Sequence, residues 1–366
     1  MHRNKNSAFM KNAAFNAILV LVGSFFFSSS VLRANEEFSI MHHIQDAHEW
    51  HLWGEGHSAS AISLPIILID KGVKCFSSSH LYHGKQQQDT LKDGSVQTYL
   101  IGVGPAKGYA LLHEKIYKLA AGRLTFHNGH PHNETPWDFS ITKNVLSLFV
   151  GGLLLLIIML VTANFYKRKG PVAPQGLAKF VEPLIVFVRD EIAIPNLPDG
   201  KHVKYIGFLT TVFFFILINN LLGMVPVFPG GANLTGNITV TFFLACCTLV
   251  ITLFSANKNY WKHIFATPGV PKALLPIMIP IEVVGIFTKP FALMIRLFAN
   301  MTAGHIIILA LFSIIFLNKS VAWAGLSVPM ALFISVLEVL VAFLQAYLFS
   351  MLSALFIGAA IEDDHH

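Results

Sequence analysis

The sequence predicts an all-α, polytopic membrane protein with about five membrane helices, of which the last two form a long slanted hairpin. A small extracytoplasmic N-terminal domain precedes them, and the sequence leaves its fold open, with α+β as one option. Two observations predict the membrane part: 54% of the residues are hydrophobic and only 13% are charged, whereas soluble domains carry about 25% charged residues. A third observation, the polar and histidine-rich composition of residues 35–140, predicts the separate domain.

Residues 1–34 predict a secretory signal peptide. Arg3, Lys5 and Lys11 precede the apolar stretch Ala13–Phe27, and small residues lead to a candidate cleavage point after Ala34. The alternative is an uncleaved first membrane helix. Both versions send the following segment out of the cytoplasm.

Residues 35–140 differ from the rest of the chain in composition. Eleven of the 17 histidines lie here, at positions 42, 43, 48, 51, 57, 80, 83, 113, 127, 130 and 132. Ala61–Asp70 and Val73–Ser78 predict short strands around Lys71-Gly72, and Tyr109–Ala121 predicts a short helix. The histidines could bind metal, but none has a convincing ligand spacing, so we favour a solvated or pH-responsive surface.

From residue 141 to 366 the pattern predicts a membrane domain. Basic residues follow the first and third spans, at Tyr166-Lys-Arg-Lys169 and near Lys258 and Lys262, which places those ends in the cytoplasm. The same bias explains the net charge of +6 without a nucleic-acid partner. The first three predicted spans are Val145–Phe165, Tyr205–Val225 and Asn237–Ala256, the last two joined by the turn Pro226–Gly236.

Gly176–Ile194 predicts a helix that lies in the membrane interface, because Lys179, Glu182 and Arg189 fall on one face among apolar residues. The three cysteines, at positions 75, 246 and 247, indicate neither a disulfide framework nor a metal site.

Residues 276–317 and 322–360 are two apolar segments of unusual length. About 40 helical residues extend ~60 Å, twice the ~30 Å hydrocarbon thickness, so each helix is broken or strongly tilted. Pro280 and Pro290 are expected to kink the first one, and Asn318-Lys-Ser320 forms the turn between them. This order of spans leaves the C-terminus in the cytoplasm, and we find no internal repeat of the kind that many transporters carry.

Arg296 is the most informative residue of the first long segment. An arginine at the centre of a bilayer costs about 2.5–3.5 kcal/mol on insertion scales, and it does not lose its proton. Glu282, Lys289 and Arg296 follow each other at seven-residue spacing and therefore share one helix face. His305 stands half a turn away, about 13 Å along the axis, while Glu282 lies about 21 Å to the cytoplasmic side.

The remaining polar residues of the membrane helices predict a path along which titratable groups could pass a proton. His305 and Glu338 could meet between the two antiparallel helices, either to pass a proton or only to fix packing. Asn300 and Gln345 either line the path or form interhelical hydrogen bonds, and the same alternatives hold for Asn219 and Asn220 near the outer end of their span. Thr288 and Thr302 are expected to bond to their own backbone.

Three blocks carry a resemblance to a known family. The stretch Lys289-Pro-Phe-Ala-Leu-Met-Ile-Arg-Leu-Phe-Ala-Asn-Met-Thr-Ala-Gly-His305 closely resembles the signature of subunit a of F-type ATP synthases. Asn219-Asn-Leu-Leu-Gly-Met-Val-Pro226 and Leu344-Gln-Ala-Tyr-Leu-Phe349 resemble two further blocks. The resemblance covers about residues 140–360 and leaves the preceding domain unexplained.

The resemblance implies a proton-channel stator of the Fo sector in the inner membrane of a bacterium. Arg296 matches the essential arginine, which faces the carboxylate of a c-subunit ring and separates two offset half-channels. Glu282 matches an acidic position on the cytoplasmic side. His305 and Glu338 match a pair in the order typical of mitochondrial forms. Gly223 replaces an acidic residue of some members, so the entry path would rely on Asn220, His305 and Glu338. The resemblance places Asn300 and Gln345 near the arginine.

The implied partners are the c-ring, the peripheral-stalk b subunits, other ATP synthase subunits and lipid, with no cofactor, no metal and no nucleic acid. The chain would have no active-site chemistry of its own, and the choice between H⁺ and Na⁺ stays open. One rival is a stand-alone secondary transporter or gated channel whose outer domain captures substrate. Another is a membrane-anchored sensor that binds metal through the histidine-rich domain.

Overall fold

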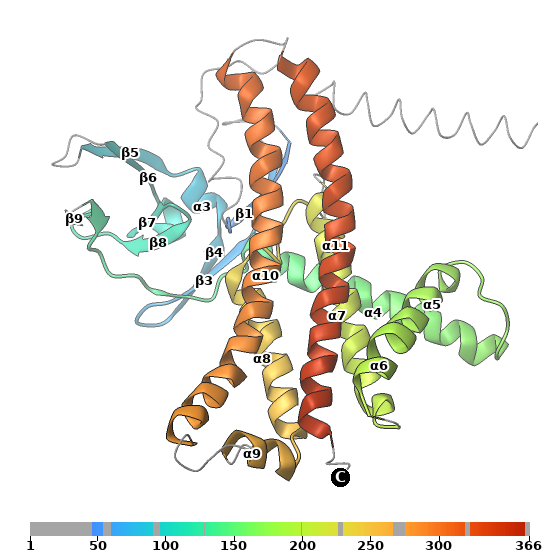
Figure 1. The fold of residues 1–366 in the computed structure, drawn as a ribbon. Coiled ribbons are helices and arrows are strands. Elements are labelled where there is room, and N and C mark those ends of the chain that lie inside the picture. The colour runs from blue at the N-terminus through green and yellow to red at the C-terminus, as the bar shows by residue number, and fades with distance from the viewer. Residues whose placement is uncertain are drawn as a thin grey trace, which may run out of the picture.

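The structure is a computed structural model that describes residues 46–53, 60–90, 96–127, 129–198, 200–225, 230–265, 275–318 and 323–362. The expected signal peptide 1–34, the histidines at 42, 43 and 57, part of the turn 226–236 and most of the hairpin turn at 318–320 lie outside the described residues. Figure 1 shows a group of strands on one side of a set of long helices.

The N-terminal domain is built almost entirely of short strands in its described part. Two of its sheets are the three-stranded β11–β3–β4 and the four-stranded β5–β6–β7–β8, and two antiparallel pairs, β1–β2 and β9–β10, flank them. The strands are β1 (Glu49–Trp53), β2 (Ser60–Ser63), β3 (Pro65–Ile69), β4 (Val73–Ser77), β5 (Lys85–Thr90), β6 (Val96–Ile101), β7 (Tyr109–Leu112), β8 (Lys115–Lys118), β9 (Phe126–His127), β10 (His130–Pro131) and β11 (Trp137–Asp138). One short helix, α3 (Ser79–Tyr82), follows β4.

The predicted strands are confirmed, with one refinement. Residues 61–70 do not form one strand: β2 pairs with β1, while β3 pairs with β4 and β11. Leu64 separates the two strands, and its backbone nitrogen donates both to Ser78 Oγ at 3.1 Å and to the His48 carbonyl oxygen at 3.4 Å. The β3–β4 turn contains Lys71 and Gly72, both with positive φ, as the Lys71-Gly72 pair suggested.

The predicted helix over Tyr109–Ala121 is wrong, because this segment forms the β7–β8 hairpin. Its two turn residues, His113 and Glu114, have φ of 48° and 62°, the left-handed values that a two-residue hairpin turn requires. All four residues of β7 are buried. A continuous apolar run of this length suits a buried strand as well as a helix, and periodicity alone does not distinguish them.

Five of the described helices are long and apolar enough to cross a membrane, which confirms the predicted polytopic architecture. They are α4 (Lys143–Lys169), α7 (His202–Met224), α8 (Ile238–Ser255), α10 (Leu275–Leu317) and α11 (Ala324–Ile361). Thr142 caps α4 by accepting from the Val145 nitrogen, and Asn237 caps α8 by accepting from the Thr239 nitrogen. Thr and Asn are favoured N-cap residues, because their side-chain oxygens accept from backbone N–H groups that have no partner in the first turn of a helix.

The predicted interfacial helix is present but interrupted. It consists of α5 (Ala178–Phe187), a π-helical turn (Val188–Ala193) and α6 (Ile194–Asn196). Lys179 and Arg189 are exposed, and Arg189 pairs with Asp190 at 2.6 Å. Val188, Ile192 and Ala193 turn inward as part of the helical core. This segment therefore has the two-sided character that its sequence indicated.

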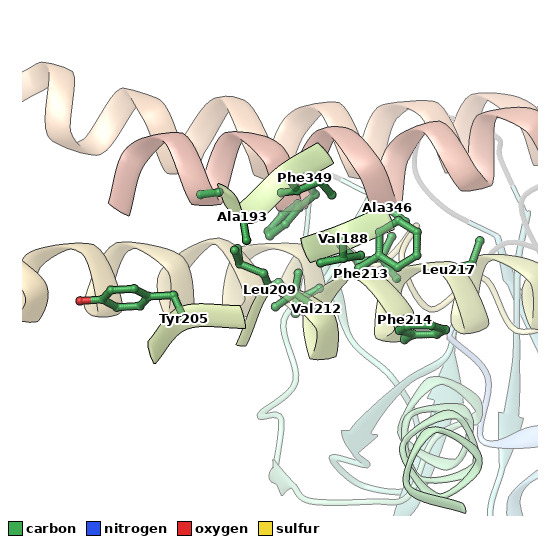
Figure 2. Packing of buried hydrophobic residues seen from close by; sticks show 14 of the residues in the cluster. Val188, Ala193, Tyr205, Leu209, Val212, Phe213, Phe214, Leu217, Ala346 and Phe349 are labelled. Atoms are coloured by element: carbon green, nitrogen blue, oxygen red, sulfur yellow. The ribbon is translucent and has the colours of Figure 1, made fainter. Parts of the chain in front are cut away.

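The helical core lies mainly between α7, α11 and the π-helical turn. Figure 2 shows Leu209, Phe213 and Leu217 of α7 at one-turn spacing, facing Ala346 and Phe349 of α11. Small residues of α11, including Ala342 and Ala346, are fully buried, so the two helix backbones approach closely. This packing fixes the orientation of α11 and of the polar residues on it.

Helices α10 and α11 form the predicted long hairpin. Pro280 and Pro290 lie inside α10, which continues through both. In the view of Figure 1 the N-terminal part of α10 diverges from α11 toward α9 (Lys258–Phe265), which follows α8. A bend is expected at prolines, because each removes one helical hydrogen bond and its ring clashes with the preceding turn.

Candidate functional site

Arg296 lies on the outer face of α10. Its side chain is exposed, as are Ala292, Ala299, Asn300 and Ala303, which stand within about 60° of it around the helix axis. Within the described residues Arg296 has no ion pair or hydrogen bond. A fixed charge surrounded by alanines is accessible to another helix, because the small side chains let a partner backbone come close.

His305 points to the opposite side of α10, as its spacing predicted. Its Nδ1 lies 3.6 Å from Glu338 Oε1 of α11, and its Nε2 lies 3.3 Å from the Gly223 carbonyl oxygen of α7. The two side chains retain only 20% and 13% of their exposure. The expected meeting of His305 and Glu338 is therefore confirmed, at a distance that falls just outside hydrogen-bonding range.

Gly304 makes room for the Glu338 carboxylate. A Cβ placed on Gly304 would stand 2.2 Å from Glu338 Oε1, far inside the contact distance of two heavy atoms. His305 Nδ1 and Glu338 Oε1 are both buried without a hydrogen-bond partner. Buried polar atoms of this kind are costly unless another group or water satisfies them.

Asn219 and Asn220 are both fully buried at the end of α7. Asn220 Oδ1 accepts from the Thr235 hydroxyl at 2.6 Å, and its Nδ2 has no partner among the described residues. Asn219 Nδ2 donates to the Phe215 carbonyl at 2.7 Å, while its Oδ1 stands where a Cβ of Gly151 would be. Asn220 is three residues, about one helical turn, before Gly223, whose carbonyl oxygen lies 3.3 Å from His305 Nε2.

Asn300 and Gln345 do not act as a pair in this structure. Asn300 is exposed beside Arg296, whereas Gln345 is buried, with 3% exposure. The described residues show no hydrogen bond between them. Thr288 donates to its own backbone at Val284, as expected, but Thr302 donates to the Gly236 carbonyl at 3.4 Å, so that expectation is wrong. The α7–α8 connection supplies an acceptor that helix geometry alone did not predict.

Glu282 lies near the start of α10 and is half-buried. Burial and the negative charge of Glu282 raise the pKa of Tyr260 on α9, so the two groups are close. A small pocket next to them is lined by Thr248, Thr252, Tyr260, Lys289 and Phe356, among others. Lys289 and Arg296 are exposed while Glu282 is partly covered, so the predicted common face holds only approximately at its Glu282 end.

The arrangement separates two kinds of charge. Arg296 presents a permanent positive charge outward, which can hold or repel an anion but cannot carry a proton. The His305–Glu338 pair lies inside the bundle on the other side of α10, and Glu282 lies beyond Arg296 along the axis. The two acidic groups, Glu282 and Glu338, thus lie apart along α10, with the permanent charge of Arg296 between them.

Sequence reasoning missed three supporting residues: Thr235, Gly304 and Gly151. Each acts across a helix interface, through a hydrogen bond or through the absence of a side chain. The available signal was weak, since small residues are frequent at all membrane helix contacts.

Comparison with known proteins adds two family matches. A family model described as ATP synthase A chain matches residues 145–358, from α4 to α11, and one described as a domain of unknown function (DUF8433) matches residues 39–139. ATP synthase subunit a 2 of Chlorobaculum tepidum is 50% identical over 245 residues, which are 64% of this chain and 68% of that protein. ATP synthase subunit a of Myxococcus xanthus is 48% identical over 235 residues, 63% of this chain and 75% of that protein.

Proposed function

This chain belongs to the ATP synthase subunit a family, and from this premise we propose how its residues pass protons to and from a rotating ring of c subunits. The chain is the proton-channel stator subunit of the Fo sector and a multi-pass membrane protein within the ATP synthase complex. We propose which residues the protons pass, which partner meets the Arg296 face, and in which direction the protons cross the membrane.

Arg296 carries the proposal, because it is a charged residue on an exposed, alanine-lined helix face. The ionised carboxylate of a ring subunit is the partner that such a face fits. Pairing the two charges lowers the cost of placing each of them at bilayer depth. When the ring turns, the carboxylate leaves Arg296 and takes up a proton before it meets lipid.

The proton is supplied from the His305–Glu338 side. Asn220 and Thr235 line the approach, and His305 and Glu338 transfer the proton toward the ring at the α10–α11 interface. After nearly a full rotation the ring carboxylate releases its proton toward Glu282. Asn300 stands beside Arg296 at the ring face, and Gln345 supports the α11 side.

The topology follows from the basic residues that end α4 and begin α9. Because basic residues are enriched on the cytoplasmic side of membrane helices, we infer that the corresponding helix ends lie in the cytoplasm. The strand domain is then extracytoplasmic, the C-terminus is cytoplasmic and Glu282 lies on the exit side. The peripheral-stalk b subunits are expected to bind the same complex.

The test is coupled ATP synthesis in inverted or reconstituted membranes that carry Arg296→Ala. The expected result is loss of synthesis in an assembled complex, because the ring carboxylate has no counter-charge. Arg189→Ala is the matched control, since Arg189 is also exposed but already pairs with Asp190. Normal coupled synthesis by Arg296→Ala would overturn the assignment.

A stand-alone transporter or gated channel is not favoured by the family match. It predicts ion flux through the purified chain without any ring, which a flux assay on the reconstituted chain measures directly.

A further inference from the structure

One face of the β11–β3–β4 sheet is apolar and uncovered. Pairing sets Trp137 opposite Ile69 and Ile69 opposite Val73, so the three side chains form a row on the same face. Their exposures are 75%, 44% and 72%. Phe139, with 59% exposure, joins this face because its nitrogen continues the ladder by donating to the Ile67 carbonyl. We call Ile69, Val73, Trp137 and Phe139 the sheet patch.

The other face of the same sheet packs inside the domain. Ile66 and Leu68 are fully buried, and Phe76 lies with them in one cluster. The sheet patch therefore does not result from a loose or unfinished core. A contiguous apolar face with exposed aromatic residues indicates a contact outside the chain.

The sheet patch is joined rigidly to the first membrane helix. The Ile141 nitrogen donates to the Pro65 carbonyl, and the Lys143 nitrogen to the Ala47 carbonyl, so the chain stays paired from β11 to α4. The Asp46 carboxylate accepts from the Thr142 hydroxyl at 2.9 Å and from the Asn144 nitrogen at 3.0 Å. Phe139 is four residues before α4, at most about 14 Å of extended chain.

The charges around the sheet patch fit a phospholipid surface. Asp70 pairs with Lys118 at 2.7 Å and Asp138 with His48 at 3.3 Å, so each of these two carboxylates has a cationic partner within the domain. Lys71 is exposed at the tip of the β3–β4 hairpin, where an ammonium group can meet lipid phosphates. Tryptophan beside a membrane helix is itself typical of the interfacial layer.

We propose that the sheet patch lies in the interfacial layer of the bilayer beside the N-terminal end of α4. In the view of Figure 1, β3 and β4 are on the side of the domain nearer the helices, and β5 and β6 are on the far side. The domain would thus be held against the membrane at two places, α4 and the sheet patch. The inference needs α4 to cross the membrane and does not depend on the role of Arg296.

Cys75 offers a direct probe. It is exposed on β4 and pairs with Ile67, on the same face as the sheet patch. In a variant with Cys246→Ala and Cys247→Ala, Cys75 is the single thiol of the chain and can carry a bimane fluorophore. The matched control carries Cys75→Ser and Gln88→Cys in the same background, because Gln88 is exposed on the edge strand β5.

The labelled full chain is reconstituted in vesicles of phosphatidylethanolamine and phosphatidylglycerol. The expected result is a blue-shifted bimane at Cys75 that is quenched by a lipid-borne nitroxide and protected from iodide. The control label should show the reverse. Quenching of the Cys75 label by iodide alone would show a water-exposed face, and protection from both quenchers would show a protein cover; either outcome overturns the proposal.

A second variant tests which side chains hold the contact. Val73→Ser with Trp137→Ser removes two exposed apolar groups without touching the buried face. We expect the Cys75 label to lose its protection from iodide. Unchanged protection would mean that the sheet patch does not make the contact.

Discussion

His48 gives the sharpest prediction for the strand domain, because it is a buried charge outside the membrane. It retains 2% exposure and lies between two carboxylates, 3.3 Å from Asp138 and 3.9 Å from Glu114. Burial by itself lowers the pKa of His48, but the hydrogen bonds and charges of Asp138 and Glu114 outweigh it and raise the pKa to about 9. His48 is therefore protonated at neutral pH in the folded domain.

The raised pKa fixes the sign of the pH dependence. Protonated His48 stabilises the domain fully below its unfolded pKa of 6.5, and this stabilisation is lost as the pH rises through about 9. The difference between the two pKa values corresponds to about 3 kcal/mol. Asp138 lies on β11, which pairs with β3. The local opening constant of the β11–β3 pairing should thus rise by about 200-fold between pH 6 and pH 9.5, since 1.4 kcal/mol is a factor of ten.

The assay is quench-flow hydrogen exchange on the reconstituted complex, read in peptides covering β3 and β11 and corrected for the intrinsic exchange rate at each pH. His48→Gln should abolish most of the pH dependence. His80→Gln is the control, because within the described residues the His80 ring makes a hydrogen-bond contact with the Ser77 carbonyl oxygen and no carboxylate pairs with it. An opening free energy that stays constant from pH 6 to pH 9.5, or that varies equally in His48→Gln, would show that His48 does not stabilise the domain.

Three substitutions test the helical site against matched controls. Gly304→Ala should push the Glu338 carboxylate away from His305 and lower ATP-driven proton pumping. The control is Gly285→Ala on the same helix, whose added Cβ meets nothing within 4 Å and should leave pumping intact. Equal pumping in both variants would contradict the role of the His305–Glu338 pair. Gly151→Ala should destabilise the α4–α7 contact by about 1–3 kcal/mol through overpacking against Asn219, measured by denaturation in mixed detergent micelles, while Gly152→Ala faces open space and should be neutral. Thr235→Val leaves the buried Asn220 oxygen without its donor and should cost about 1–3 kcal/mol in the same assay, compared with Thr211→Val, whose exposed hydroxyl bonds only to its own helix.

The sequence predicted the helical part well because its information is local. Helix α10 carries its polar residues at spacings that place Arg296 and His305 on opposite sides, and the structure keeps this arrangement over the half of the helix beyond Pro290. The meeting of His305 and Glu338 followed from an antiparallel hairpin with a short turn, again a local feature. Family resemblance then identified the chemistry that the spacing alone left open.

The errors arose where distant segments decide the outcome. The β7–β8 hairpin was mistaken for a helix because its buried apolar run lacks a diagnostic period and its turn residues, His113 and Glu114, are not typical turn formers. Thr302 bonds to Gly236 in a connection that is far away in sequence. Gln345 is buried because α11 packs this part of its surface against α7, whereas Asn300 lies on the exposed face of α10. Sequence spacing does not show which face of each helix is covered.

In the mechanism that we propose, Arg296 blocks a direct path between two proton sites. Passive proton conductance through Fo, measured in membrane vesicles after removal of the F1 sector, reports on this block. We expect Arg296→Ala to allow a proton leak that the wild-type ring and stator do not, alongside lost ATP synthesis, and we expect Glu338→Gln added to this variant to reduce the leak. Proton conductance as low as that of the wild type in Arg296→Ala vesicles, with the ring present and correctly assembled, would contradict this role of Arg296.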